Sequence, residues 1–275
     1  MGDCGKKIRL NRVLGGAEHR ALVVAFDHAL VLGPIPGTED PLGKIGQFAQ
    51  ARVDALLLNL GLIRQFANSP MVGRIPALIA RLDWTTVWSA IGENRGGALR
   101  STLLARPEEA LRHGADAVLT YLVVGTGDAE FETKEIARNA EIGRECERVG
   151  IPFIVESLAR GKEVQNPGDQ KWLNLHTRMA AELGADCVKT DYSGDVASMR
   201  SVVKGCPIPI LVLGGNRHAS DKQALDLVRD VAASGAAGVF FGRNVFQADN
   251  MSRFLEQARA ALDAVPTAEF QAITK

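Results

Sequence analysis

The chain has 275 residues, of which 46% are hydrophobic and 23% are charged, and its 32 basic residues balance its 32 acidic residues. This length suits one large α/β domain or two small ones, and it is sufficient to bury a sizeable core. The lack of net charge argues against electrostatic binding to nucleic acid, and no apolar run approaches the roughly 20 residues that span a bilayer.

Short apolar runs recur along the chain, and a longer segment follows each of them. The runs are nearly uniform in hydrophobicity, which is typical of parallel strands buried on both faces. In chain order they cover residues 21–26, 54–59, 76–82, 115–122, 152–155, 185–189, 209–213 and 237–241.

The segments between the runs indicate helices. Residues 133–149 place Ile136, Ala140, Gly143 and Cys146 on one side, and residues 221–234 place an apolar stripe among charges. Several runs follow a Gly-Ala pair, as expected for a helix C-cap before the next strand.

Eight strand–helix units predict a single-domain (β/α)8 TIM barrel over residues 21–275. We expect residues 1–20 to be an N-terminal extension or helix that packs on the barrel. An open doubly wound sheet is the alternative, although no GxGxxG motif follows the first run.

Active sites of this fold lie where the strands end. The first strand ends at Asp27-His28, where Asp27 could orient a lysine or take a proton, or could instead cap the next turn. His28 is a candidate for contacting substrate. Asn59 ends the second strand, and Arg81 and Asp83 end the third; substrate contact stays open for each.

Tyr121 lies near the end of the fourth strand, where it is a minor acid/base candidate or a packing residue. Glu156 follows the apolar run of the fifth strand, where a carboxylate is unexpected. We predict an acid/base role for Glu156; the alternative is a structural ion pair with Arg160.

Lys189 ends the sixth apolar run. Burial favours the neutral amine of a lysine, and a neutral amine condenses with a ketone to form an iminium ion, the electron sink for breaking or making a C–C bond. The alternative is an ion-paired lysine that keeps its charged end in water, with Asp191 or Asp195 as its partner.

The last two strands end in glycines that could bind phosphate. Gly214 and Gly215 are followed by Arg217, and Gly242 is followed by Arg243. Loops after strands seven and eight commonly bind phosphate in barrels, and glycine lets the backbone approach it closely. The alternative is a pair of tight turns without a ligand.

The four cysteines share no CxxC spacing and form no zinc-type cluster with histidine. The N-terminal segment has charge but no apolar stretch typical of a signal peptide. We therefore expect a cytoplasmic protein with reduced thiols, no metal and no membrane or nucleic-acid partner.

Five segments together resemble the archaeal-type (DhnA-like) class I fructose-bisphosphate aldolases and the related DeoC-like aldolases, and they span nearly the whole chain in family order. They are KIRLNRVL at 7–14, AFDHALVLGPIPG at 25–37, GADCVKTDYSGD at 184–195, VLGGNRHASD at 212–221 and GAAGVFFGRNVFQ at 235–247.

The resemblance implies that Lys189 is the Schiff-base lysine, with Asp27 beside it. It implies that Gly214, Gly215, Gly242 and Arg243 bind phosphate. It also implies that no metal or other cofactor is needed and that the chain forms a homo-oligomer, such as a ring of barrels.

One position departs from the family pattern. Fructose-bisphosphate aldolases of this type have a tyrosine acid/base in a W-S-Y-P-R-G segment, where this chain has Leu158, and their tryptophan position is Glu156. A glutamate at this strand end is similar to the tagatose-bisphosphate aldolases. Glu156, with Asp27 or Tyr121, would therefore have to move the protons.

We predict a Schiff-base aldolase that cleaves or forms a C–C bond in a phosphorylated ketose. One alternative is thiolase-like acyl transfer from a phosphorylated dione to coenzyme A. Another is a catalytically silent barrel that binds a sugar phosphate.

Overall fold

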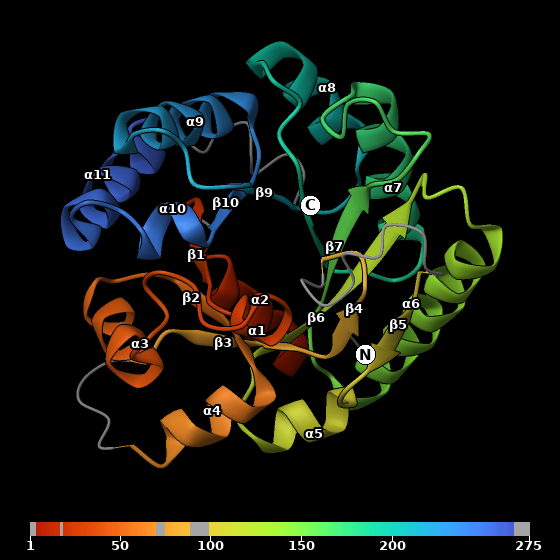
Figure 1. The fold of residues 1–275 in the computed structure, drawn as a ribbon, viewed down its shortest axis with the longest axis horizontal. Helices are drawn as coiled ribbons and strands as arrows, with labels where there is room; N and C mark the ends of the chain where they lie inside the picture. The colour runs from red at the N-terminus through yellow and green to blue at the C-terminus, as the bar shows by residue number, and fades with distance from the viewer. Residues whose placement is uncertain (1–3, 17–18, 70–74, 89–98, 267–275) are drawn as a thin grey trace.

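All eight apolar runs form parallel strands that close into a barrel in the computed structural model, which describes residues 4–16, 19–69, 75–88 and 99–266 (Figure 1). The barrel strands are β1 (Ala21–Ala25), β2 (Ala55–Asn59), β3 (Ala77–Arg81), β6 (Ala117–Val124), β7 (Phe153–Ala159), β8 (Cys187–Thr190), β9 (Ile210–Leu213) and β10 (Gly238–Phe241). β1 pairs with β10 as well as with β2, so the sheet has no edge. The predicted barrel is confirmed, and the open doubly wound sheet is excluded.

Helices surround the barrel and follow the strands in sequence (Figure 1). The outer helices are α3 (Pro41–Gln50), α4 (Leu60–Ala67), α5 (Pro107–Arg112), α6 (Ala129–Val149), α7 (Gln170–Glu182), α8 (Val196–Gly205), α9 (Asp221–Ser234) and α11 (Met251–Asp263). Two short helices, α2 (Ala29–Leu32) and α10 (Arg243–Phe246), follow β1 and β10 directly. Within the described part of the chain, no helix is long and apolar enough to cross a membrane.

Helix α1 (Cys4–Val13) precedes the barrel and packs on it. Val13 and Leu14 join the apolar cluster inside the barrel. Arg12 pairs with Asp116 at 2.6 Å, just before β6. These contacts attach the helix to the barrel at the N-terminal ends of the strands, away from the predicted site.

The strand residues divide by alternation between two apolar clusters. Leu22, Val24 and their counterparts on other strands pack against the outer helices, whereas Ala21, Val23 and Ala25 face the barrel interior. Successive strand side chains point to opposite faces, so residues two apart share a face. The interior cluster includes an apolar residue from each of five strands: Ala25, Ile79, Leu119, Ile154 and Cys187. The side chains two positions further on are Asp27, Arg81, Tyr121, Glu156 and Lys189, so they continue the interior layers toward the mouth.

Helix ends account for the Gly-Ala pairs. Gly235 caps α9 in the left-handed conformation with φ of +85°, and Gly184 after α7 has φ of +94°. A residue with a Cβ atom is strained in this region, and glycine is not.

The structure differs from the sequence prediction at an inserted hairpin and at strand lengths. β4 (Asp83–Thr85) and β5 (Ser101–Leu103) form an antiparallel pair after β3 that no apolar run announces, because each strand has only three residues. β6 and β7 also continue to Val124 and Ala159, so Tyr121 and Glu156 lie within strands rather than at their ends.

The predicted buried face of α6 is confirmed at Gly143 and Cys146 and corrected at Ile136. Ile136, assigned to the core, is 37% exposed, whereas Glu135 and Asn139 are buried. Polar residues on the buried face shifted the apparent apolar stripe by one position. Glu135 pairs with Arg138 at 2.7 Å as part of a buried ion-pair network.

Candidate active site

The interior polar side chains form one wall of a cavity of about 390 Å³ at the C-terminal ends of the strands. Strand pairing sets Tyr121 beside Glu156 and Glu156 beside Lys189, so three strands present these side chains at one level. Asp27 and Arg81 line the same cavity. A larger cavity of about 800 Å³ lies outside the barrel between β5 and the first half of α6, and the described residues that line it do not line the cavity at the strand ends.

Lys189 is 5% exposed, and its ammonium nitrogen lies 2.8 Å from Oε1 of Glu156. The same nitrogen lies 4.6 Å from the ring centroid of Phe240. The alternative partners named from the sequence are corrected, because Asp191 pairs with Arg160 and Asp195 caps α8. Lys189 therefore projects into the cavity toward Glu156.

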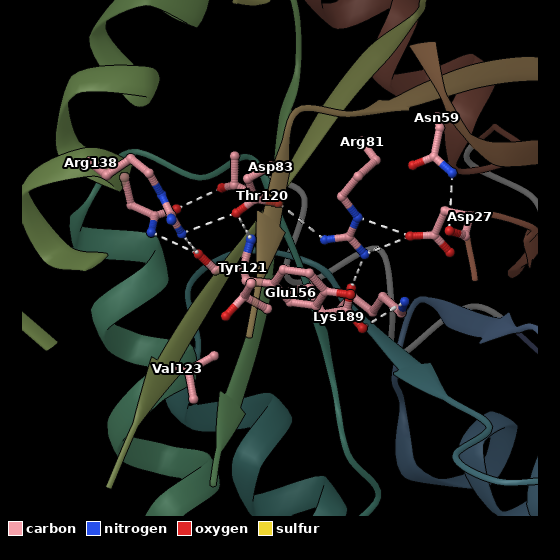
Figure 2. A network of polar contacts seen from close by, with 12 residues as sticks. Asp27, Asn59, Arg81, Asp83, Thr120, Tyr121, Val123, Arg138, Glu156 and Lys189 are labelled. Carbon is pink, nitrogen blue, oxygen red and sulfur yellow. Dashed lines mark hydrogen bonds and ion pairs between the residues drawn. The ribbon is translucent and has the colours of Figure 1, made fainter. Parts of the chain in front are cut away.

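Glu156 lies between two cations (Figure 2). Its Oε2 accepts a hydrogen bond of 2.5 Å from Nη2 of Arg81, and its Oε1 faces Lys189. Burial would raise the pKa of Glu156, but Lys189 and Arg81 outweigh burial and lower it. The expected structural partner Arg160 is corrected, because Arg160 forms a two-point ion pair with Asp191 at 2.7 and 2.9 Å.

Asp27 contacts the same Nη2 nitrogen of Arg81 that contacts Glu156. Its Oδ2 lies 2.8 Å from Nη2 of Arg81, and Asn59 donates to its backbone carbonyl at 3.0 Å. Burial would raise the pKa of Asp27, but the charges of Arg81, His28 and Lys189 lower it to about 2. Asp27 is therefore ionised at neutral pH.

Arg81 is the central residue of the site, although the sequence only left open whether it contacts substrate. Its side chain is 2% exposed, bridges Asp27 and Glu156, and lies 3.8 Å over the ring of Tyr121 (Figure 2). Burial raises the pKa of Tyr121 well above its ordinary value, so its hydroxyl stays protonated at neutral pH. The available sequence signal was a charged residue two positions after the interior residue Ile79.

The loops after β9 and β10 lie across the cavity from β3. Gly214, Gly215, Gly242, Arg243 and His28 line the cavity. A Cβ atom on Gly242 would overlap the imidazole of His28. The backbone at position 242 can therefore lie this close to His28 only because glycine has no side chain.

The cationic residues near these loops have different surroundings. Among the described residues, Nε of Arg243 is buried without a hydrogen-bond partner, and burial lowers the pKa of this guanidinium. Arg217 lies outside the residues that line the cavity, where it pairs with Asp221 at 2.5 Å and donates to the carbonyl of Gln247 at 3.1 Å. Within the same described residues, Nη1 of Arg217 is also buried without a hydrogen-bond partner, so what distinguishes the two arginines is that Arg243 lines the cavity and Arg217 does not.

Asn244 fixes the shape of the loops and was not singled out from the sequence. Its amide nitrogen donates to the carbonyl of Gly214 at 2.8 Å, and its oxygen accepts from the backbone of His218 at 2.8 Å. The side chain is fully buried. A single residue of the segment that follows β10 therefore holds the loop after β9 in place.

The depressed pKa of Asp27 predicts a pH-dependent contribution to stability. Its pKa falls from 3.8 to about 2 on folding, so the ionised carboxylate stabilises the fold above pH 3.8. The stabilisation is lost as the pH falls toward 2. The pH-dependent part is about 2 kcal/mol. We expect the difference in free energy of unfolding between wild type and Asp27→Asn to shrink by that amount between pH 6 and pH 2. An equal difference at both pH values would contradict the assignment.

A (β/α)8 barrel with this site at its mouth has the architecture of a barrel aldolase, and comparison with known proteins agrees. The DeoC/LacD family aldolase model matches residues 21–248. The chain belongs to this family, so it is a carbon–carbon lyase, and the resemblance drawn from its sequence is confirmed.

Individual relatives are similar over most of their length. An uncharacterized aldolase of Saccharolobus solfataricus is 36% identical over 248 residues, which cover 89% of each chain. A 2-amino-4,5-dihydroxy-6-oxo-7-(phosphonooxy)heptanoate synthase of Streptomyces griseus is 34% identical over 245 residues, which cover 88% of this chain and 85% of the relative. An archaeal fructose-1,6-bisphosphate aldolase, solved with its catalytic lysine bound to a carbinolamine intermediate, has a TM-score of 0.82 and 25% identity, and the match covers 94% of this chain and 99% of that one.

Proposed function

We propose that this chain is a class I aldolase that forms a Schiff base through Lys189 and breaks or makes a carbon–carbon bond in a phosphorylated ketose. The observation that supports it best is the short contact between the buried Lys189 nitrogen and Glu156, at the mouth of an aldolase-family barrel. The similar archaeal enzyme reacts through a lysine, and the similar Streptomyces synthase is named for a phosphorylated keto product.

In this mechanism, Lys189 passes a proton to Glu156 and attacks the ketone carbon of the substrate. One proton of the attacking nitrogen moves to the former ketone oxygen, which gives a neutral carbinolamine. Its hydroxyl group then takes up the proton from Glu156 and leaves as water, which gives an iminium ion. The ionised form of Glu156 is then available again as a base, 2.8 Å from the lysine nitrogen.

Cleavage then uses the iminium ion as an electron sink. A base, Glu156 or Asp27, removes the proton from the hydroxyl group on the leaving carbon, and the C–C bond breaks as an aldehyde departs. The electron pair of the broken bond moves toward the iminium nitrogen and leaves an enamine. The carboxyl group that took up the hydroxyl proton returns a proton to the enamine carbon. Hydrolysis of the resulting iminium ion releases the shorter ketone and free Lys189, and the reverse sequence forms the bond.

The test is borohydride trapping with dihydroxyacetone phosphate and a panel of sugar phosphates, followed by intact mass and peptide mapping. We expect an adduct on Lys189 and product formation that does not depend on coenzyme A. A requirement for coenzyme A would support acyl transfer. Binding of a sugar phosphate without any adduct would support a catalytically silent barrel.

Arg243 is the expected charged ligand of the substrate phosphate. Because a charge-assisted hydrogen bond contributes about 1.5–3 kcal/mol, Arg243→Met should raise KM for phosphorylated substrate about tenfold or more. Trapping of unphosphorylated dihydroxyacetone should be unchanged. The exposed Arg253 on α11 provides a control, since Arg253→Met removes a cation that does not line the cavity. An unchanged KM in Arg243→Met would show that the phosphate binds elsewhere.

A further inference from the structure

A line of alternating charges leads from Lys189 through the barrel wall to α6 (Figure 2). We call it the buried charge chain; in order, its members are Lys189, Glu156, Arg81, Asp83, Arg138 and Glu135. Its outer end, at Arg138 and Glu135, lines the cavity between β5 and α6. The catalytic cluster is therefore connected to residues that do not line the catalytic cavity.

The links of the buried charge chain differ in length. Arg81 lies 2.5 Å from Glu156 but 3.5 Å from Oδ1 of Asp83. Oδ2 of Asp83 lies 3.0 Å from Nη2 of Arg138. Arg81 thus contacts Glu156 closely and Asp83 loosely.

Asp83 is fully enclosed and has fixed partners. Its side chain is 0% exposed, and Oδ2 accepts a hydrogen bond of 2.8 Å from the backbone nitrogen of Tyr121. Arg138 also donates to the carbonyl of Tyr121 at 2.8 Å, so it is anchored to β6. An enclosed carboxylate needs compensating charge, and Arg138 supplies it from the side away from Arg81.

Loss of Arg138 would change this balance. Asp83 would remain buried with Arg81 as its nearest cation, and the 3.5 Å contact leaves room for the two to approach. Because Arg81 is held by three carboxylates, movement toward Asp83 would take its guanidinium away from Glu156. Glu156 would then lose the partner that fixes it beside Lys189.

We propose that Asp83 and Arg138 are positioning residues for the reaction: they hold Arg81 where it keeps Glu156 against Lys189. This inference rests on the proposed aldolase function and extends it to residues that touch no substrate.

The experiment compares Arg138→Gln, Arg138→Lys and wild type. We expect Arg138→Gln to lower kcat about tenfold to a hundredfold with little change in KM, because small displacements of catalytic groups have effects of that order. Arg138→Lys should recover most of the loss, since it restores the cation. In a crystal structure of Arg138→Gln, the Arg81–Asp83 distance should be shorter than 3.5 Å and Arg81 should be withdrawn from Glu156.

Arg106→Gln is the matched control. Arg106, which precedes α5, pairs with Glu141 and Glu145 of α6, the helix that carries Arg138, at 2.7 and 2.9 Å. Its side chain is 47% exposed and lies outside the buried charge chain. Its loss should leave kcat unchanged.

Wild-type kcat in a folded Arg138→Gln, with Arg81 in place, would overturn the proposal. If that variant does not fold, the near-isosteric Asp83→Asn tests the role from the other side: Arg81 loses its charged partner at position 83, so Arg81 should move away from that position and kcat should fall. An unmoved Arg81 with wild-type kcat in Asp83→Asn would also overturn the proposal. Failure of wild type to form a borohydride adduct would reject the aldolase mechanism itself, whereas the position of Arg81 in the variants tests the positioning role separately.

Discussion

Lys189→Ala is expected to abolish both turnover and the borohydride-trapped adduct. The lysine nitrogen forms the covalent bond to substrate in the proposed mechanism, so its loss should lower kcat at least about a thousandfold. Steady-state turnover and intact mass after borohydride treatment measure the two effects. Because Glu156 keeps Arg81 as a partner at 2.5 Å, the buried carboxylate is not left without a cation.

The control for this variant is Lys222→Ala. Lys222 is 83% exposed and pairs with Asp226 on α9, so its removal deletes an exposed ion pair of small energetic value. Turnover and adduct formation in Lys222→Ala should match those of wild type. An adduct at another lysine in Lys189→Ala, or turnover close to wild type, would reject Lys189 as the nucleophile.

The barrel could be predicted from the sequence because each strand is buried on both faces. Runs such as 209–213 are apolar at every position, and their number distinguishes a closed barrel from a smaller open sheet. The hairpin of β4 and β5 gave no such signal, since three-residue strands have too few positions to show a pattern.

Individual candidate residues could also be predicted, because a charge at the end of an apolar run is conspicuous. Lys189 and Glu156 were found in this way, and strand pairing places them side by side. The ion-pair partners named in the alternative interpretations, Arg160 for Glu156 and Asp191 or Asp195 for Lys189, are wrong, because nearness in sequence was used in place of nearness in the barrel.

Arg81 illustrates what the sequence could not reveal. It contacts Asp27, 54 residues away, and Glu156, 75 residues away, so no local pattern connects the three. A rule was nevertheless available: the residue two positions after an interior strand residue faces the mouth. Applying it requires knowing which alternate set faces inward, and uniformly apolar strands hide that information.

The same limit applies to the two arginines after β9 and β10. Arg217 and Arg243 both follow glycines at strand ends, so the sequence predicts the same role for both. In the structure, Arg217 is already paired with Asp221, whereas Arg243 lines the cavity. The difference depends on loop conformation, which Asn244 fixes through contacts between two loops.

Glu156→Gln is expected to separate adduct formation from turnover. Glutamine keeps the size of the side chain and can still accept a hydrogen bond from Arg81, but it cannot carry a proton. Because general acid–base catalysis contributes about 10²- to 10⁴-fold, kcat should fall by at least about a hundredfold. Lys189 remains in place, so a borohydride adduct should still accumulate with dihydroxyacetone phosphate, although more slowly than in wild type.

The exposed Glu182, which pairs with Arg178 on α7, provides the control as Glu182→Gln. Removing the charge of Glu156 leaves Arg81 with the carboxylates of Asp27 and Asp83, so the free energy of unfolding must be measured alongside kcat. A folded Glu156→Gln that turns over like wild type would assign the proton transfers to Asp27 or Tyr121, and the glutamate would then be structural. Adduct without turnover in Glu156→Gln, together with no adduct in Lys189→Ala, would instead give the two neighbouring residues distinct roles: one bonds the substrate and the other moves its protons.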